Sequence, residues 1–200
     1  MIEMLVVVAI IGLLLAMLQP CLASVLSKSR QASCASNLAQ LSLAFRQYVQ
    51  DYDEHGPIAY DAPTPWPLWG GVPAPVWYGE LDVYLKSDQV VICPSDQPPH
   101  RLLSTGAPPF NASYAYNDWL ALVADANVQD PSGTVLATDC ASNYAYRTND
   151  GKLGTVLPTY HSGGWNVAYY DGHVKWRDVR QPDAGYHWAN GFPNPVRAGF

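Results

Sequence analysis

An unbroken apolar run near the N-terminus constrains this chain more than any other feature of its sequence. From Met4 to Leu18, fifteen consecutive residues are apolar or Gly, and Glu3 just before them carries the first charge. A helix that spans a bilayer needs about 20 apolar residues, so this run is a short membrane-spanning segment. We expect it to form a helix that faces lipid, because it has no polar face for water.

Other interpretations of the run fit less well. A secretory signal peptide carries a basic region before its apolar core, whereas the only charge here is the acidic Glu3. The Cys21–Ala23 segment can pass as a cleavage site, so the signal-peptide alternative stays open. Lipidation at Cys21 is disfavoured, because Pro20 stands where a small residue is expected.

Glu3 requires an explanation, because a carboxylate at the head of an apolar helix costs several kcal/mol in hydrocarbon unless a partner neutralises it. The free amine of another copy's N-terminus is such a partner. The segment IEMLVVVAIIGLLLAMLQP resembles the N-terminal helix of type IV pilins and secretion pseudopilins. Glu3 falls on the assembly glutamate of that family, Gly12 on its helix glycine and Pro20 on its helix proline. Two residues precede Glu3, whereas four precede it in mature family chains, so the resemblance does not fix the mature N-terminus.

The resemblance implies a structural subunit of an extracellular type IV pilus-like or pseudopilus filament. Such a subunit waits in the cytoplasmic (inner) membrane as a single-span protein. A prepilin peptidase and a pilus or secretion assembly machinery act on it, and many copies then form a helical homopolymer on the cell surface. The implied fold is α+β, with a long N-terminal helix on a small antiparallel β-sheet domain with long loops. We expect the helix to be kinked or partly melted between Gly12 and Pro20.

The sequence predicts that the helix continues well past Pro20, since no Gly or Pro follows until Gly56. Apolar residues recur at three- and four-residue steps, which is typical of an amphipathic helix. This stripe comprises Cys34, Leu38, Leu41, Phe45, Tyr48 and Tyr52. We therefore divide the chain into an apolar helix half (1–20), an amphipathic helix half (21–54) and a β-rich head domain (55–200).

Short strands and loops are expected in the head, because most of the 15 Gly and 17 Pro residues follow residue 55. The sequence predicts a short helix followed by a strand at Val90–Cys93, an ordered stretch at Ser113–Trp119 and a strand at Thr134–Cys140. Asp171-Gly172 between alternating runs predicts a type I′ hairpin. Its strands would be Asn166–Tyr170 and His173–Asp178.

The head also resembles prepilin-like proteins named for an H-X9-DG signature, which His161 and Asp171-Gly172 match. We expect His161 to hydrogen-bond to the turn or to Asp171, while Gly172 supplies a positive φ. The alternative is a metal site of His161, Asp171 and His173, since zinc accepts such ligands. That site would suit a metal-dependent surface enzyme. No Ser or Cys nucleophile is placed beside a base, so we assign no catalytic residue and do not expect an enzyme.

Four cysteines occur in the sequence, and the resemblance implies their use. Cys34 and Cys93 match cysteines of the similar proteins and are expected to form a disulfide between helix and head. Cys140 is an alternative partner for Cys93, and Cys21 is expected to be a free thiol at the lipid boundary.

Further ligand and partner classes are weakly indicated. The stretch Asp51–Gly56 begins like an EF-hand loop, but Ala62 occupies the position of its closing Glu, so we expect a helix stop instead. We assign no cofactor, and calcium stays an unassigned alternative because pseudopilins of this general shape use it. A net charge of −6 gives no basic surface for nucleic acid. Trp66 and Trp69 favour, as an alternative function, a membrane-anchored glycan-binding protein, and Asn111 begins a weak glycosylation sequon.

Overall fold

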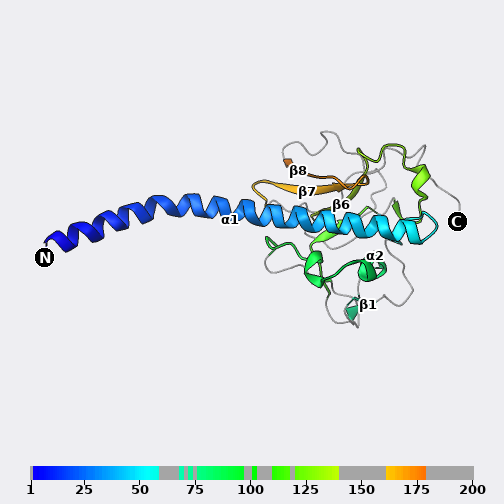
Figure 1. The fold of residues 1–200 in the computed structure, drawn as a ribbon, viewed down its shortest axis with the longest axis horizontal. Coiled ribbons are helices and arrows are strands. Elements are labelled where there is room, and N and C mark those ends of the chain that lie inside the picture. The colour runs from blue at the N-terminus through cyan, green and yellow to red at the C-terminus, as the bar shows by residue number, and fades with distance from the viewer. Residues whose placement is uncertain are drawn as a thin grey trace.

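One long helix dominates the computed structural model, and a small head surrounds its C-terminal half (Figure 1). The structure describes residues 2–58, 68–69, 72–73, 76–96, 101–102, 110–117, 120–139 and 161–178. Helix α1 covers Ile2–Asp51, which at about 1.5 Å per residue is roughly 75 Å long. The head lies around residues 31 to 51 of α1, and the rest of the helix projects away from it.

The predicted kink or melted turn between Gly12 and Pro20 is wrong, because α1 is helical through both residues and curves only gently (Figure 1). A proline in a helix interior removes one hydrogen bond. The residues LLLAMLQ before Pro20 favour a helix, and no further Gly or Pro follows until Gly56, so the helix continues across that single loss.

The helix ends where the sequence predicts a stop. After Asp51 the backbone N–H of Glu54 donates to the Val49 carbonyl at 2.9 Å, and Asp53 and Glu54 both adopt positive φ. Left-handed residues of this kind close a helix by satisfying its last carbonyls. The stretch Asp51–Gly56 is therefore a helix terminus, as expected.

A four-stranded antiparallel sheet covers one side of α1. Its order is β5-β6-β7-β8, and its strands are β5 (Tyr114–Tyr116), β6 (Val135–Asp139), β7 (Gly164–Tyr169) and β8 (Val174–Asp178). Two small ribbons pair β1 (Leu68–Trp69) with β2 (Val72–Pro73), and β3 (Arg101–Leu102) with β4 (Phe110–Asn111). The short helical elements are α2 (Val76–Leu81), η1 (Asp82–Tyr84), η2 (Asp88–Val91) and η4 (Asp125–Asn127). The α+β class is confirmed.

Two of the predicted head elements have different outcomes. The strand expected over Thr134–Cys140 is confirmed by β6. The strand expected at Val90–Cys93 is wrong, because residues 88–91 form the 3-10 helix η2. The Ser87 side chain accepts a hydrogen bond from the Gln89 backbone N–H at 3.2 Å and starts that helical turn. The run resembled a strand because Val90, Val91 and Ile92 are β-branched, and the burial of Val90 and Val91 is reached in a helical turn instead.

The β7–β8 hairpin is confirmed, but its turn differs from the predicted one. Trp165 pairs with Arg177 and Ala168 with Val174. The Gly172 N–H donates to the Tyr169 carbonyl at 2.9 Å, and Gly172 has φ +94°. A type I′ turn needs positive φ at Asp171 as well, which the structure does not have. The connection is a three-residue loop with one left-handed glycine, the pattern of a type I turn with a bulge.

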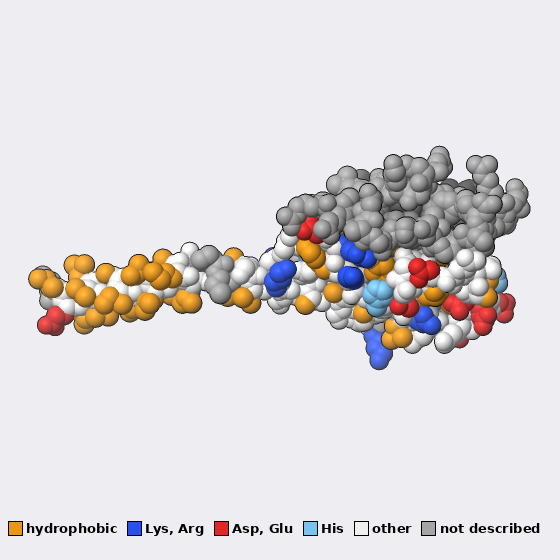
Figure 2. All heavy atoms as spheres, turned by 90° about the horizontal axis from the view of Figure 1, so that it is seen from above, with side chains coloured by type: hydrophobic (Ala, Val, Ile, Leu, Met, Phe, Trp, Pro, Cys, Tyr) orange, Lys and Arg blue, Asp and Glu red, His pale blue; other side chains and the backbone are white. Residues whose placement is uncertain are grey.

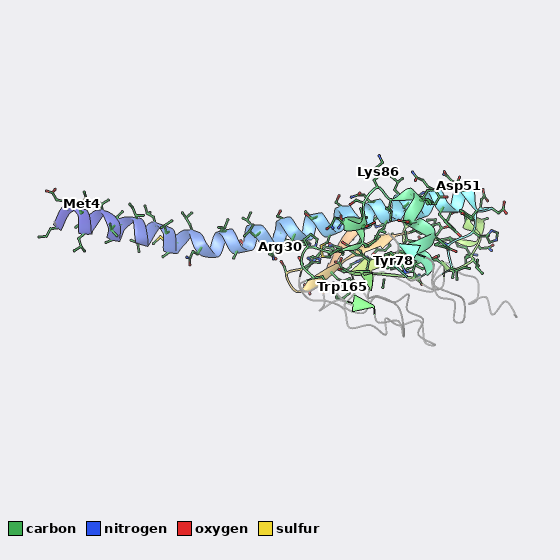
Figure 3. All side chains as sticks on the ribbon, turned by 90° about the horizontal axis from the view of Figure 1, so that it is seen from below. Met4, Arg30, Asp51, Tyr78, Lys86 and Trp165 are labelled. Carbon is green, nitrogen blue, oxygen red and sulfur yellow. A yellow bond between two sulfur atoms is a disulfide. The ribbon has the colours of Figure 1, made fainter. Side chains whose placement is uncertain are left out.

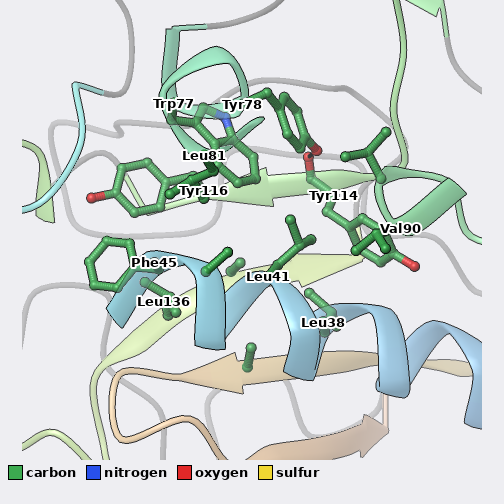
Figure 4. Packing of buried hydrophobic residues seen from close by; sticks show 14 of the residues in the cluster. Leu38, Leu41, Phe45, Trp77, Tyr78, Leu81, Val90, Tyr114, Tyr116 and Leu136 are labelled. Atoms are coloured by element: carbon green, nitrogen blue, oxygen red, sulfur yellow. Dashed lines mark hydrogen bonds between the residues drawn. The ribbon is translucent and has the colours of Figure 1, made fainter. Parts of the chain in front are cut away.

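The hydrophobic core lies between α1, β5, β6 and α2 (Figure 4). The α1 stripe contributes Cys34, Leu38, Leu41, Phe45 and Tyr48, all buried as predicted. They meet Trp77, Tyr78 and Leu81 of α2, Tyr114 and Tyr116 of β5, and Leu136 of β6. Tyr52 was also assigned to this stripe, but it lies just past the helix end and is 53% exposed. It stacks on Tyr48 instead, with ring centroids 4.2 Å apart.

Candidate functional site

The N-terminal half of α1 forms an exposed apolar surface, here called the assembly helix and defined as Ile2–Leu26. Every side chain that the structure describes in this segment is exposed. Figure 2 shows apolar side chains around the rod, and Figure 3 shows Met4 near its tip and Arg30 close to the head. Among the described residues, α1 is the one helix long and apolar enough to cross a membrane.

Glu3 lies at the free tip of the assembly helix, in its first turn. It is exposed, and the next charged residue along the chain is Lys28, near the head. A Cβ added at Gly12 would meet no atom within 4 Å, so nothing in a single copy contacts this position. Glu3, Gly12 and Pro20 thus lie along one helix. Neither Glu3 nor Gly12 contacts the head.

The signature residues His161 and Asp171 do not meet. His161 precedes β7, whereas Asp171 and Gly172 follow it. A six-residue strand is about 20 Å long at roughly 3.3 Å per residue. The predicted bond between His161 and Asp171 is therefore wrong, and so is the metal set of His161, Asp171 and His173. The signature instead marks the two ends of one central strand.

Asp171 and Gly172 have the structural role that the sequence predicts for the turn. The Asp171 Oδ1 accepts from the His173 backbone N–H at 3.1 Å and lies 2.6 Å from the His173 Nδ1. Both side chains are partly exposed. The Asp171 N–H donates to the Pro131 carbonyl at 3.1 Å, which ties the turn to the loop before β6.

His161 belongs to a different, buried group, here called the signature cluster: Cys34, Cys93, Asp139 and His161. All four residues are fully buried. The His161 Nε2 lies 3.2 Å from the Asp139 Oδ2 and 3.3 Å from the Cys93 Sγ. Since the same nitrogen faces both groups, the arrangement is no catalytic triad, in which the two ring nitrogens serve different partners.

Asp139 ends β6 and accepts a hydrogen bond from the Asn166 backbone N–H at 2.6 Å. Burial raises the pKa of the Asp139 carboxyl, while His161 and Asn166 act in the opposite direction. A buried carboxylate requires such partners, because an uncompensated charge in the interior is costly. Asp139 is not among the site residues predicted from the sequence, although a lone acidic residue at the end of the run TVLATD was a usable signal.

The disulfide between Cys34 and Cys93 is confirmed, with Cα atoms 5.0 Å apart. It joins α1 to the loop after η2 across 59 residues of chain. Two further bonds hold the same region: the Asn37 Nδ2 donates to the Ile92 carbonyl at 2.9 Å, and the Asn166 Nδ2 donates to the Gln31 carbonyl at 3.3 Å. The signature cluster thus lies where α1, the η2 loop and the sheet are fastened together.

The loop from His161 to Gly164 is held by Trp176 of β8. The Trp176 Nε1 donates to the His161 carbonyl at 2.8 Å. A Cβ at Gly164 would lie 2.7 Å from the indole and 2.0 Å from the Arg177 carbonyl oxygen, so only glycine fits there. Ser162 and Gly163 both have positive φ, which turns the chain sharply between His161 and β7.

Several predicted sites fall outside the described residues or side chains. They are Trp66 of the proposed glycan loop, the thiol of Cys21, and Cys140. Trp69 lies in β1 and Asn111 in β4, but their side chains are likewise outside the description.

Comparison with protein-family models, with curated proteins and with solved structures finds no match for this chain. The resemblance to pilins therefore rests on the residues themselves, and the assembly function stays a prediction.

Proposed function

We propose that this chain is the structural subunit of an extracellular type IV pilus-like or pseudopilus filament, and that it polymerises through α1. The observation that carries the proposal is the assembly helix, Ile2–Leu26, which stands clear of the head with an acidic residue at its tip. Monomeric soluble proteins rarely expose contiguous apolar surface beyond a few hundred Å². Such a surface must be shielded from water. In this proposal lipid shields it before assembly, and other copies of the helix shield it afterwards.

Burial of the apolar run stabilises the polymer. Each apolar side chain that moves from lipid or water into a bundle of helices gains close packing, and water exclusion adds roughly 25 cal/mol per Å². The head contains the C-terminal part of α1 in its own core, so it stays folded while the assembly helix exchanges one environment for another. If different surfaces of neighbouring copies meet in this bundle, the contacts do not close on themselves and an open filament forms.

Glu3 sets the register in this proposal. Its carboxylate has no basic neighbour within the first 27 residues of the chain. In a bundle of copies, the N-terminal amine of a neighbouring chain lies at the same depth and neutralises it. A charge pair in a dry environment contributes far more than one in water, because little solvent screens it. Longitudinal displacement of one helix would leave both charges unpaired, which fixes the stagger between subunits.

The partners implied are many copies of this chain, a prepilin peptidase, an assembly machinery and the cytoplasmic membrane before assembly. No observation favours a second function over this one. The glycan alternative depends on Trp66, outside the described residues, and on the Trp69 side chain, also outside the description. The metal-enzyme alternative depended on His161, Asp171 and His173, which the structure does not bring together.

Replacement of Glu3 tests the proposal. The full-length chain and its Glu3→Gln and Glu3→Asp variants are produced in the native host, and sheared surface material is imaged by electron microscopy with the subunit identified by mass. We expect Glu3→Gln to lower polymer yield by more than about tenfold, since loss of 1.4 kcal/mol per contact already changes an equilibrium tenfold. Glu3→Asp keeps the charge and should retain filaments.

Circular dichroism of each variant in detergent checks that the head stays folded, because Glu3 is remote from the core. Wild-type yields of filament from Glu3→Gln would contradict the proposal. So would a wild-type chain that is present in the membrane of its host yet gives no polymer.

A further inference from the structure

The signature cluster places two sulfurs, an imidazole and a carboxylate together in the interior. The ligand atoms of Cys34, Cys93 and His161 all lie within 4.8 Å of one another, and all three residues are buried. Asp139 adjoins them through its 3.2 Å contact with the His161 Nε2. While the sulfurs are bonded to each other they are poor ligands, because a metal binds the thiolate form of cysteine.

We propose that reduction of the Cys34–Cys93 disulfide converts the signature cluster into a site for a zinc-type divalent metal. Cys34, Cys93 and His161 are three ligands that already lie close together. The Asp139 carboxylate adjoins only His161 among them, so it becomes the fourth ligand by moving toward the sulfurs. Two thiolates with one imidazole and one oxygen donor form a set that zinc accepts. This inference does not depend on filament assembly, since every ligand lies in the head.

The spacing supports a tetrahedral ion. Ligands bound at 2.0–2.3 Å in tetrahedral geometry lie about 3.3–3.8 Å from one another. The His161 Nε2 is already 3.2 Å from the Asp139 Oδ2 and 3.3 Å from the Cys93 Sγ. The two sulfurs must separate once their bond is broken, and the Asp139 carboxylate must approach them. Rotation about the Cα–Cβ bonds provides that movement with the Cα atoms 5.0 Å apart.

Conversion of the disulfide into the metal site takes two steps, reduction and metal binding. A thiol reductant delivers two electrons to the disulfide, the sulfur–sulfur bond breaks, and the two sulfurs take up two protons as the reductant becomes a disulfide. The metal ion then displaces both protons and binds the two thiolates, while the Nε2 lone pair of His161 becomes its third donor. For this step the ring proton of His161 must be on Nδ1, because Nε2 needs a free lone pair to bind the metal. The direct contact between Nε2 and Asp139 is then replaced by binding of both groups to the same ion.

Metal binding would join the same parts of the fold as the disulfide does. Cys34 comes from α1, Cys93 from the loop after η2, Asp139 from β6 and His161 from the loop before β7. A newly made chain carries thiols before any oxidant acts on it. While Cys34 and Cys93 are reduced, the metal thus joins the same elements that the disulfide joins later. Oxidation of the two thiolates to the disulfide would release the ion.

The test uses the full chain in mild detergent, with Cys21→Ser and Cys140→Ser introduced so that Cys34 and Cys93 are the only thiols. The protein is reduced under nitrogen, freed of reductant and titrated with Co²⁺, then with Zn²⁺. We expect one cobalt per chain with a thiolate charge-transfer band and the visible bands of a tetrahedral site. Zinc should displace cobalt and raise the thermal midpoint of the reduced chain.

His161→Gln is the decisive variant, because the glutamine amide can still donate to Asp139 but cannot replace the imidazole as a ligand. Loss of an outer-shell partner typically weakens metal binding by roughly 10- to 100-fold, so loss of the ligand His161 should cost at least about 100-fold. His173→Ala removes an exposed histidine and is the matched control, with unchanged metal binding expected.

Absence of cobalt binding by the reduced parent chain would overturn the proposal. A His161→Gln chain that binds cobalt as tightly as the parent would overturn it as well. If the reduced chain loses its near-ultraviolet circular dichroism, recovery of that signal with Zn²⁺ supports the site, because binding is then coupled to folding. Failure of Zn²⁺ to restore the signal counts against it.

Discussion

Several buried polar residues in this protein connect segments that are far apart in the sequence. Asp139 bridges His161 and the backbone of Asn166. Ser113, also buried, donates to the Asp96 Oδ2 at 2.6 Å. An unsatisfied buried polar group costs about 1–3 kcal/mol, so such residues specify which loop lies against which strand. At this scale the head is positioned by polar contacts as well as by its apolar core.

Glu80 of α2 gives a pH-dependent prediction. Its Oε2 accepts from the Ile58 backbone N–H at 2.9 Å, and Tyr48 also hydrogen-bonds to it. Burial raises the pKa of Glu80, and these two bonds partly oppose that shift. The folded state then holds a proton that the unfolded state has released. The free energy of unfolding therefore falls as pH rises from the ordinary pKa of glutamate through the raised one.

Glu80→Gln cannot ionise and should remove this slope. Relative to wild type, its thermal midpoint should improve as pH rises from about 4 to 7, because that range begins near the ordinary glutamate value. Melting followed by circular dichroism at several pH values measures the difference. Glu54→Gln changes an exposed glutamate nearby and serves as control. An unchanged difference between wild type and Glu80→Gln across this range would contradict the assignment.

At the scale of elements, the β7–β8 hairpin is fixed at both of its ends. The turn end has Gly172 with φ +94°, and the other end has Gly164 packed under Trp176. The H-X9-DG signature therefore encloses β7: its histidine lies in the cluster at one end, and its Asp-Gly forms the turn at the other. Contacts at both ends therefore favour the observed register of β7 against β8.

Gly164→Ala should destabilise the head strongly. Its Cβ would lie 2.0 Å from the Arg177 carbonyl oxygen, which is backbone and cannot move alone. We expect a loss of about 3 kcal/mol, the upper part of the range for overpacking. Gly163→Ala is the matched control: its Cβ meets nothing within 4 Å, and its positive φ costs about 1–2 kcal/mol. Thermal unfolding in detergent compares the two, and equal losses would refute the steric account.

The molecule as a whole has two parts with opposite exposure. The assembly helix, Ile2–Leu26, is apolar and exposed, whereas the buried residues of α1 begin at Cys34. No residue of the assembly helix belongs to the described core. One continuous helix therefore has an exposed apolar half and a half that packs into the head. We expect the head to fold without the apolar half.

Removal of residues 1–26 should give a water-soluble, monomeric head. The shortened chain keeps Cys34, the disulfide and the whole described core, so its near-ultraviolet circular dichroism should match that of the full chain in detergent. Sedimentation without detergent measures the oligomeric state. The full-length chain under the same conditions should aggregate. A shortened chain that precipitates or loses its tertiary signal would show that the head depends on the apolar half.

Local patterns in the sequence correctly predicted several features. The apolar run and the stripe from Cys34 to Tyr48 predicted the long helix, because helical periodicity is a property of neighbouring residues. The runs before and after Asp171-Gly172 predicted a hairpin for the same reason. The end of the helix at Asp51–Gly56 was likewise predicted from neighbouring residues. The disulfide was expected from a resemblance, and its geometry agrees.

The sequence by itself determined which segments are helix, hairpin and apolar surface, since each depends on residues a few positions apart. Only the tertiary structure decided where His161 points. Its partners Asp139 and Cys93 are 22 and 68 residues away along the chain, and no periodicity relates residues at such separations. The predicted bond to Asp171 failed because a strand of about 20 Å separates the two, a distance that residue spacing indicates only after the strand is placed. Long-range packing, which brings α1, η2 and the sheet together, created the signature cluster.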